Sequence, residues 1–233
     1  MKGTILQPTY LPWLGYFEMI DSSDVFVVFD HVQFERKSWQ NRNRIKTANG
    51  ETYLTVPVEK ASQKTRISEI KISYSQGNHL ENHWKTIMLS YKKSPHFEKH
   101  KILFEKIYSK KYVLLKDLNT DLIKLVCDIL GIKTKIIFSS KLNLKDENME
   151  KTEKVINLCK NQGITCLYDA KGAEEILDKS LFQKEGIIIK FQDYKHPEYS
   201  QLWGEFVPYL SAVDLVFNEG DKSLSIIKSG VKT

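Results

Sequence analysis

An α/β fold with a mostly parallel sheet is predicted, because apolar runs alternate with helical patterns at both ends of the chain. At the start, an apolar run at residues 4–6 is followed by helical spacing over 13–20 and a second apolar run at 25–29. This strand–helix–strand order is the smallest unit that makes two neighbouring parallel strands. Towards the end, strands are expected at 135–138, 165–168 and 186–191, and helices at 148–161, 173–177, 212–217 and 222–228.

The middle of the chain has a different character. Two strand-like pieces, 43–47 and 51–58, are joined through Asn-Gly, which is a strong hairpin signal, and residues 67–72 alternate as a further strand would. Apolar residues then recur at helical spacing, and a glycine follows as a C-terminal cap. The helices are expected at 80–91, 97–108 and 113–130, with the cap at Gly131. Since there are no repeats and no low-complexity linker, we expect a single α/β domain over 1–233 with a helical insert at about 80–130.

Size and composition narrow the class of protein. A chain of 233 residues, 41% of them hydrophobic, can bury a sizeable core. No stretch approaches the roughly 18 uncharged apolar residues of a membrane span, and Gln7 and Pro8 interrupt what would be the apolar part of a signal peptide. The three cysteines, Cys127, Cys159 and Cys166, are far apart, which is typical of buried thiols in a reducing compartment. A cytoplasmic location is therefore expected.

Histidine pairs are the only pattern that suggests a metal. His79/His83 and His96/His100 have the i, i+4 spacing of ligands on one helix face. Neither pair has a nearby carboxylate or thiol in a recognisable ligand pattern, and two of these histidines fall at predicted helix starts, where polar residues are ordinary. We expect no metal site and no cofactor.

Positive charge is concentrated between residues 31 and 46, which carry a net charge of +4 in a chain whose total is +6. Solvated helix faces favour Lys and Glu, whereas Arg, Asn, Gln and Trp dominate here. Their fixed donors suit phosphate, pyrophosphate or carboxylate, and an indole among them can stack on a base or sugar. An anionic ligand is therefore expected, either a nucleotide-linked molecule or a nucleic acid. The candidate contacts are Arg36, Trp39, Asn41, Arg42, Asn43 and Arg44.

Polar side chains follow the first two predicted strands at the points where they end. Gln7 and Tyr10 come after the first strand, and Asp30, His31 and Gln33 after the second. In open α/β sheets, ligands bind outside the carboxyl ends of the strands. A histidine suits proton transfer near neutral pH, and the neighbouring aspartate would orient it or act as the base itself. The alternative is an ordinary surface His-Asp pair.

A loop rich in His, Tyr, Gln and Pro follows the last predicted strand and belongs at the same edge of the sheet. Its candidate site residues are His196, Tyr199 and Gln201, and further along the chain Asp214 and Asn218. Asp214 falls in the first turn of a predicted helix, so its position fits a structural role as well as a role in the site.

The layout of residues 4–34 resembles the opening of the nucleotidylyltransferase fold, a Rossmann-like fold that includes pantothenate synthetase and the class I tRNA synthetase core. In that fold a His-x-Gly-His turn starts the first helix, and the equivalent slot here reads Trp13-Leu14-Gly15-Tyr16. Because both histidines are absent, the resemblance extends to the fold and not to adenylyl transfer. Trp13 contacts a ligand in this reading, and the alternative is that Trp13 and Tyr16 simply pack.

Several segments together resemble the WbqC-like family. They are QPTYLPWLGYFE at 7–18, the strand end at 30–34, SWQNRNRIK at 38–46, LTVPV at 54–58, HPEYSQ at 196–201 and LSAVDLVFNEG at 210–220. The family is associated with bacterial O-antigen and surface-polysaccharide gene sets, hence with lipopolysaccharide, and is proposed to include glycine transferases that aminoacylate an amino sugar. This chain departs from it in two places: His31 stands where the family tends to have a second aspartate, and 168–173 lack a Ser-Gly-containing turn.

The resemblance implies an N-acyl (aminoacyl, for example glycyl) transferase acting on a nucleotide-linked amino sugar in O-antigen or surface-polysaccharide biosynthesis. The base would be Asp30, His31 or His196, and the tetrahedral oxyanion would be stabilised by Gln7, Gln33, Asn41 or Asn43. Arg36, Arg42 and Arg44 would hold pyrophosphate, and Trp13 or Trp39 would stack on the base or sugar. Aminoacyl-tRNA as the acyl donor would suit the basic charge.

Two other classes of function remain open. One is a non-catalytic module that binds a nucleotide sugar or RNA, and the other is a nucleotidylyltransferase with altered catalytic groups. All three classes of function share one geometric expectation, which is that Gln7, Arg42 and His196 face a single pocket although His196 is more than 150 positions away from the other two in the chain.

Overall fold

A five-stranded parallel sheet forms the centre of the protein in the computed structural model, which describes residues 1–232. In spatial order the strands are β5 (Lys135–Phe138), β2 (Val25–Val28), β1 (Lys2–Leu6), β6 (Cys166–Asp169) and β7 (Ile188–Phe191). All neighbouring pairs are parallel. Numbered along the chain, the order is 3-2-1-4-5, as in Rossmann-type sheets. The prediction of an α/β fold with a mostly parallel sheet is confirmed.

The central strands are buried on both faces, as parallel strands usually are. β2 reads Val-Phe-Val-Val, and all four side chains are buried. From β1 the chain continues to β2 on one side, whereas the later strand β6 joins β1 on the other side. Ligands of open α/β sheets bind where the strand order reverses in this way, outside the carboxyl ends of the strands. In this protein that point lies beyond Leu6 and Asp169.

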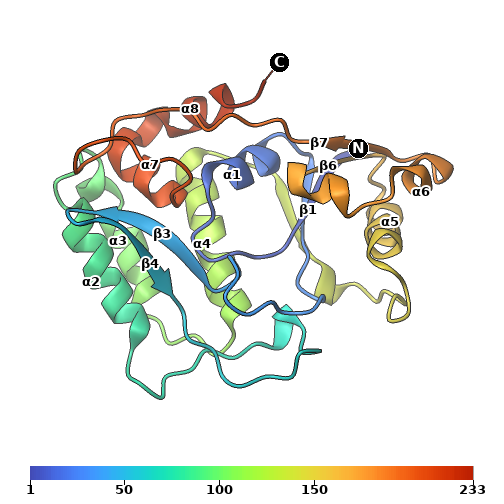
Figure 1. Cartoon of the computed structure of the whole chain (residues 1–233), viewed down its shortest axis with the longest axis horizontal. Helices are drawn as coiled ribbons and strands as arrows, with labels where there is room; N and C mark the ends of the chain where they lie inside the picture. Colours follow the sequence, from blue (N-terminus) through green and yellow to red (C-terminus); the bar gives the residue numbers. More distant parts are fainter. Residues whose placement is uncertain (233) are drawn as a thin grey trace.

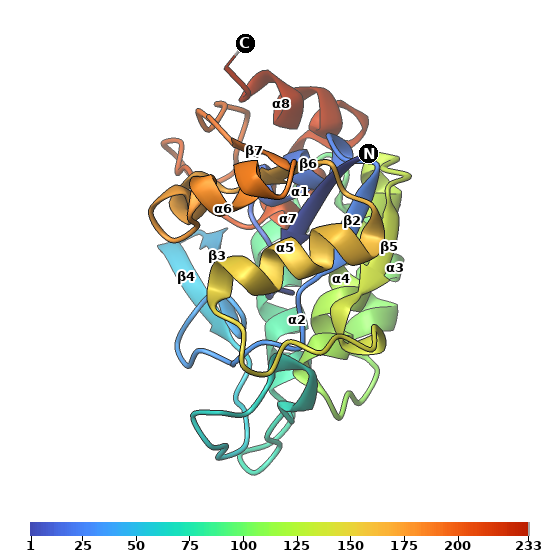
Figure 2. The same cartoon turned by 90° about the vertical axis from the view of Figure 1, so that its right-hand side faces the viewer.

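Helices cover both faces of the sheet (Figures 1 and 2). On one face α1, α4, α7 and α8 contribute to one hydrophobic cluster, and on the other α5 and α6 form a second cluster with Ile5, Val25 and Val27. The bounds are α1 (Leu14–Asp21), α4 (Leu115–Leu130), α5 (Lys151–Gln162), α6 (Lys179–Lys184), α7 (Ala212–Glu219) and α8 (Ser223–Ser229).

The segment between β2 and β5 contains the predicted hairpin and helices. They are β3 (Arg42–Thr47) and β4 (Gly50–Thr55), which pair antiparallel, and α2 (His79–Tyr91) and α3 (Phe97–Tyr108). Their buried side chains belong to the same cluster as α1, α4 and α7, so this segment packs against the helical layer of the sheet. α4 ends at Gly131 with φ of 75°, the left-handed cap that the sequence predicts.

Two local predictions are wrong. Residues 67–72 form a 3-10 turn, Ile67–Glu69, followed by isolated bridges, because the buried isoleucines are held by backbone bonds to loops rather than by a neighbouring strand. The helix expected at 173–177 is a 3-10 turn, Lys171–Glu175, and the real helix, α6, begins after Asp178, whose carboxylate accepts the Ser180 N–H. Two further 3-10 turns occupy Ser139–Lys141 and Gly220–Lys222.

Candidate functional site

A pocket of about 360 Å³ lies beyond the carboxyl end of β1. Three chain segments form its wall: the β1–α1 connection with the start of α1, the run that leads into β3, and the loop before α7. The lining residues are Thr9, Pro12, Trp13, Tyr16, Trp39, Asn43, Arg44 and Tyr209. We call this the aromatic pocket, since two indoles and two phenols surround one arginine and one asparagine.

Backbone bonds hold the three segments together. The Ser211 N–H donates to the carbonyl oxygen of Arg44 (3.0 Å), and the Ala212 N–H donates to that of Pro12 (2.9 Å). Trp13 and Ser211 also form an isolated antiparallel bridge. Because these bonds use main-chain atoms, they fix the pocket wall independently of the side chains that line it. Segments about 200 positions apart therefore meet at one site.

Strained backbone is concentrated around this pocket. Within residues 1–232, four non-glycine residues have a clearly positive φ: Leu11 (47°), Lys37 (58°), Trp203 (67°) and Tyr209 (58°). Each lies on a loop that contributes to the pocket or leads into it. Non-glycine residues in this region cost about 1–3 kcal/mol each and occur preferentially at functional sites. This clustering supports a functional role for the pocket.

Trp13 is placed by the first turn of α1. A Cβ added at Gly15 would lie 2.5 Å from Trp13 Cζ2, so the indole lies directly over the glycine. The glycine in the Trp-Leu-Gly-Tyr slot is therefore required for close approach.

We expect Gly15→Ala to displace the Trp13 indole and to weaken ligand binding in the aromatic pocket. The net loss in unfolding free energy is about 1 kcal/mol, because overpacking costs roughly 1–3 kcal/mol and the higher helix propensity of alanine returns about 1 kcal/mol. Tryptophan fluorescence and calorimetric titration would measure the two effects. Gly172→Ala is the matched control, since nothing lies within 4 Å of its added Cβ. Equal behaviour of the two variants would refute the placement of Trp13.

Arg44 lines the pocket and carries a buried donor without a partner in the described part of the chain. Its Nη1 donates to Glu51 Oε2 at 2.7 Å, and Nη2 has only a 3.5 Å contact with the Tyr209 carbonyl oxygen. Nε is buried and has no hydrogen-bond partner among residues 1–232. The Nε–Nη2 edge of a guanidinium is suited to bidentate binding of a carboxylate or phosphate, and buried unpaired donors are costly. An anionic group at this edge would satisfy Arg44.

Asn43 lines the same wall, but its amide is engaged within the protein. Nδ2 donates to the carbonyl oxygen of Leu11 at 2.5 Å, and Oδ1 accepts the N–H of Arg44 at 2.7 Å. Asn43 therefore holds the β1–α1 connection against β3 and fixes the backbone from which Arg44 extends.

His196 packs behind the pocket wall, with its ring centroid 4.9 Å from that of Tyr209. Only 8% of the residue is exposed. Nδ1 lies 3.0 Å from the Pro197 carbonyl oxygen, whereas Nε2 is buried without a partner among residues 1–232. Burial lowers the pKa of His196. A neutral ring that donates from Nδ1 leaves the Nε2 lone pair free to accept a proton.

Three predicted residues from the tail form a buried network instead of lining the pocket. The Asp214 carboxylate accepts hydrogen bonds from the hydroxyls of Tyr91 (2.8 Å) and Tyr199 (2.9 Å), and Asn218 Nδ2 donates to the Asp214 carbonyl oxygen (2.8 Å). Burial raises the pKa of Asp214, an effect that the two hydroxyl donors partly offset. This network anchors α7 to the helical insert.

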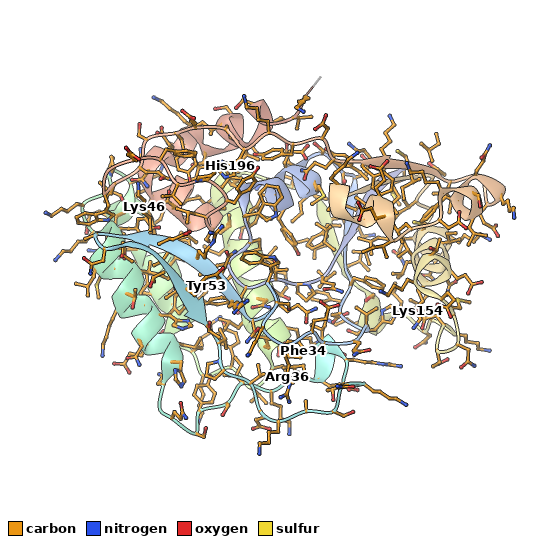
Figure 3. All side chains as sticks on the ribbon, viewed as in Figure 1. Phe34, Arg36, Lys46, Tyr53, Lys154 and His196 are labelled. Carbon is orange, nitrogen blue, oxygen red and sulfur yellow. The ribbon has the colours of Figure 1, made fainter. Side chains whose placement is uncertain are left out.

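The fourth tail residue, Gln201, begins a loop that we call the strap, residues 201–209. The buried ammonium of Lys46 donates to Gln201 Oε1 (3.2 Å) and to the carbonyl oxygens of Gly204 and Glu205. Trp203 Nε1 donates to the Ser90 carbonyl oxygen (2.8 Å). Lys46 thus fixes the loop that ends at Tyr209, and Figure 3 shows Lys46 and His196 in the same part of the molecule.

Asp30 and His31 lie in a separate buried network at the ends of β2 and β5. Asp30 is fully buried; Oδ1 accepts from Ser139 Oγ (3.0 Å) and from the Ser140 N–H (2.8 Å). Its Oδ2 accepts from Ser140 Oγ (2.7 Å) and lies 3.6 Å from Lys116 Nζ. Both ring nitrogens of His31 have partners: Nδ1 lies 2.7 Å from Ser139 Oγ, and Nε2 lies 2.8 Å from Asp146 Oδ2.

The remaining predicted residues are dispersed. The Tyr10 hydroxyl is enclosed in the core with His83 and Tyr108, Gln7 Oε1 accepts from Gln40, and Asn41 Nδ2 donates to the Val56 carbonyl oxygen. Arg42 Cζ lies 5.1 Å from the ring centroid of Tyr53. Gln33 and Arg36 are exposed, and Figure 3 shows Arg36 far from His196. The structure brings together Trp13, Trp39, Asn43 and Arg44 in the pocket wall, with His196 behind it.

Sequence reasoning missed several residues at these sites. Ser139 and Ser140 directly follow β5, so the strand-end argument applied to Asp30 would have found them. No local pattern marks Tyr209, because it reaches the pocket only through the packing of the loop before α7 against β3.

Asp169, at the end of β6, is a further titratable residue at this edge of the sheet. Burial raises the pKa of its carboxyl group to about 6, although the Ala170 N–H donates to Oδ1 at 2.7 Å.

Asp169→Asn is expected to stabilise the protein at pH 7 by about 3 kcal/mol, since the pKa rises from 3.8 to about 6 and one pKa unit corresponds to about 1.4 kcal/mol. The folded state holds the Asp169 proton more tightly than the unfolded state, so wild-type stability falls as the pH rises from 3.8 to about 6. The variant does not lose stability in this way, so the difference in unfolding free energy between the two proteins should vanish below pH 3.8. Urea unfolding at several pH values measures it. Glu147→Gln, at an exposed carboxylate, is the control; a pH-independent difference for Asp169→Asn would contradict the assignment.

The fold and the pocket define the class of this molecule as an α/β protein of Rossmann-type strand order with an aromatic, arginine-bearing pocket at the carboxyl edge of its sheet. The chain belongs to the WbqC-like protein family, whose model matches residues 7–226. It is 34% identical over 222 residues to the uncharacterized protein Rv1507c of Mycobacterium tuberculosis, with 94% of each chain covered. No solved structure matches the chain.

Two further features of residues 1–232 bear on what the protein binds. Among the helices within residues 1–232, none combines the length and the apolar character required to cross a membrane. No three His, Cys, Asp or Glu side chains in that range are grouped so that they could hold a metal ion. Nδ1 of His83, a member of one of the i, i+4 histidine pairs, lies 2.8 Å from the Tyr10 hydroxyl, and burial lowers the pKa of His83 to about 4.

Proposed function

We propose that this protein is an N-acyltransferase that moves an aminoacyl group, such as glycyl, onto the amine of a nucleotide-linked amino sugar in the cytoplasm, as a step in O-antigen or surface-polysaccharide biosynthesis. The observation that carries the proposal is that one pocket combines aromatic stacking surfaces with Arg44, whose buried Nε has no hydrogen-bond partner among residues 1–232. A nucleotide-linked sugar offers both complementary features, a flat base and a pyrophosphate. The Rossmann-type strand order supports a nucleotide ligand at this edge of the sheet.

In the proposed complex, Trp13 or Trp39 stacks on the base or sugar, and Arg44 holds a phosphate oxygen pair through Nε and Nη2. Trp39 is 49% exposed at the rim, so it is free to close over a ligand. Arg36 and Arg42 do not line the pocket, so we assign the anion to Arg44 rather than to all three arginines.

The chemistry requires a neutral amine. Its lone pair attacks the acyl carbonyl carbon, a C–N bond forms, and the bond from that carbon to the donor's leaving group breaks. The proton released by the amine passes to His196 Nε2, which is available because burial lowers the pKa of this histidine and keeps the ring neutral. Tyr209, which is 49% exposed, lies against His196 and would turn aside to open the path.

The other two predicted bases receive a different role in this account. Both His31 nitrogens and both Asp30 oxygens are engaged by protein groups, so we assign these residues to holding the strand ends. Among the four predicted oxyanion donors, Asn43 lines the pocket, whereas Gln7, Gln33 and Asn41 do not. We also propose that the fold is related to the nucleotidylyltransferase fold, on the basis of the strand order of the sheet and the sequence of the first turn of α1.

The test is to incubate the purified protein with a dTDP-linked amino sugar and either glycyl-tRNA or free glycine with ATP, and to detect the amide by mass spectrometry. Amide formation is expected, and His196→Gln should lower kcat by about 10²–10⁴-fold while binding of the dTDP sugar is retained. Binding without amide formation from any donor would favour a non-catalytic module. Release of pyrophosphate from a nucleoside triphosphate and sugar phosphate would favour a nucleotidylyltransferase.

A further inference from the structure

The two helices of the insert share one pattern on their outer faces. On α2, Lys85, Met88, Leu89 and Lys92 are spaced i, i+3, i+4, i+7, and on α3 the same spacing holds for Lys99, Ile102, Leu103 and Lys106. Residues at this spacing lie on one side of a helix. Each helix therefore presents two neighbouring aliphatic side chains with a lysine one turn before and one turn after them.

These faces are open in the structure. Leu89 is 62% exposed and Ile102 55% exposed, whereas the opposite sides of the helices, with Ile87 and Phe104, are fully buried in the core. α2 packs against α3 as a helical hairpin. Figure 1 shows this hairpin at the end of the molecule away from α5 and α6.

Charge on this hairpin is unbalanced. Residues 79–108 contain six lysines and three glutamates, a net charge of +3. Lys85 pairs with Glu81 and Lys99 with Asp221. Within residues 1–232, Lys92 and Lys106 form no ion pair, although both are exposed. Nearby carboxylates therefore neutralise only part of the positive charge on the hairpin.

We propose that the outer face of the α2–α3 hairpin docks the protein on an anionic lipid membrane surface. Aliphatic side chains framed by lysines suit the boundary between headgroups and acyl chains, because the aliphatic groups enter the boundary while the lysine stems lie along it and their ammonium groups reach the lipid phosphates. A nucleic-acid surface combines its lysines with arginines and with aromatic side chains on which bases stack, and the eight positions of the pattern carry no arginine and no aromatic side chain. The occupant is therefore a membrane containing acidic lipids.

Flotation of the full-length protein with vesicles tests this proposal. Binding is expected to phosphatidylcholine vesicles that contain phosphatidylglycerol, to weaken with salt, and to be absent from pure phosphatidylcholine. Leu89→Glu/Ile102→Glu should lower the bound fraction about tenfold or more. The matched control is Ile176→Glu/Ile188→Glu, which alters two equally exposed side chains elsewhere, 57% and 59% exposed, and should bind as wild type does.

Several outcomes would overturn the proposal: no binding of the wild type to anionic vesicles at low salt, equal loss in the control variant, or a wild-type dimer that Leu89→Glu/Ile102→Glu converts to monomers in sedimentation, which would make the face a contact between two copies. Retention of an RNA oligonucleotide by the wild type, lost in the same variant without any vesicle binding, would also overturn it. Should Leu89→Glu/Ile102→Glu fail to fold by circular dichroism, Lys92→Gln/Lys106→Gln replaces it, with the same tenfold loss expected.

Discussion

Replacing Arg44 by methionine is expected to weaken binding of a dTDP-linked amino sugar by roughly 10- to 150-fold. The substitution removes the Nε–Nη2 edge, and hydrogen bonds to charged groups contribute about 1.5–3 kcal/mol. Arg44→Lys should recover little of the loss, because a lysine ammonium keeps the charge but lacks the planar bidentate edge. Calorimetric titration of each variant measures the Kd.

Arg42→Met is the matched control for this experiment. Arg42 lies two positions earlier in β3 but stacks over Tyr53 outside the pocket wall, so its loss should change Kd less than about threefold. The comparison separates a specific anion contact from the general basic charge of the segment. If Arg42→Met and Arg44→Met weakened binding equally, the anion would be held by diffuse charge and the assignment to Arg44 would fail.

Replacing Asp30 by alanine is expected to lower the free energy of unfolding by about 3–5 kcal/mol, the usual cost of removing one partner from a buried charged network. The fully buried carboxylate accepts from Ser139 and Ser140 and lies beside Lys116, and each of the three would lose this acceptor. Urea unfolding measures the loss. Glu35→Ala, at an exposed carboxylate a few positions later, should change stability by less than about 0.5 kcal/mol.

A second variant distinguishes the structural role of Asp30 from a catalytic one. Asp30→Ala/Lys116→Met removes the unpaired ammonium as well, and should recover part of the lost stability. In the proposed account, turnover by the folded fraction of this double variant remains within about tenfold of wild type. A fully folded Asp30→Asn protein with abolished turnover would instead restore Asp30 as the base.

Much of the fold could be predicted because its signals are local. β2 is a continuous apolar run flanked by polar residues, and α4 shows helical spacing ended by Gly131. The segment 67–72 misled the prediction because its isoleucines are buried by loops from distant parts of the chain, so alternation there reflects tertiary contacts and not a strand. α6 was missed because it is short and its start depends on the Asp178 cap.

Site residues could be predicted where their position follows from the end of a nearby strand. Arg44, Asn43 and Trp39 were candidates because fixed donors and an indole follow β2 in one short run, and they do line the pocket. Asp30 does lie at the carboxyl end of β2, as the same argument predicts. Its burial, however, depends on the pairing of β5 with β2 and on the serines that follow β5. No local sequence pattern predicts that pairing. Tyr209 depends in the same way on the return of the tail.

A structure of the protein with a bound dTDP-linked amino sugar tests the central claim most directly. We expect the ligand to occupy the aromatic pocket, with a ring against Trp13 or Trp39 and a phosphate oxygen within hydrogen-bonding distance of Arg44 Nε. The molecule offers a clear alternative, a groove of about 310 Å³ between α5 and α6 lined by Lys160 and Lys184 among others. A ligand bound in that groove, with the aromatic pocket empty, would contradict the account.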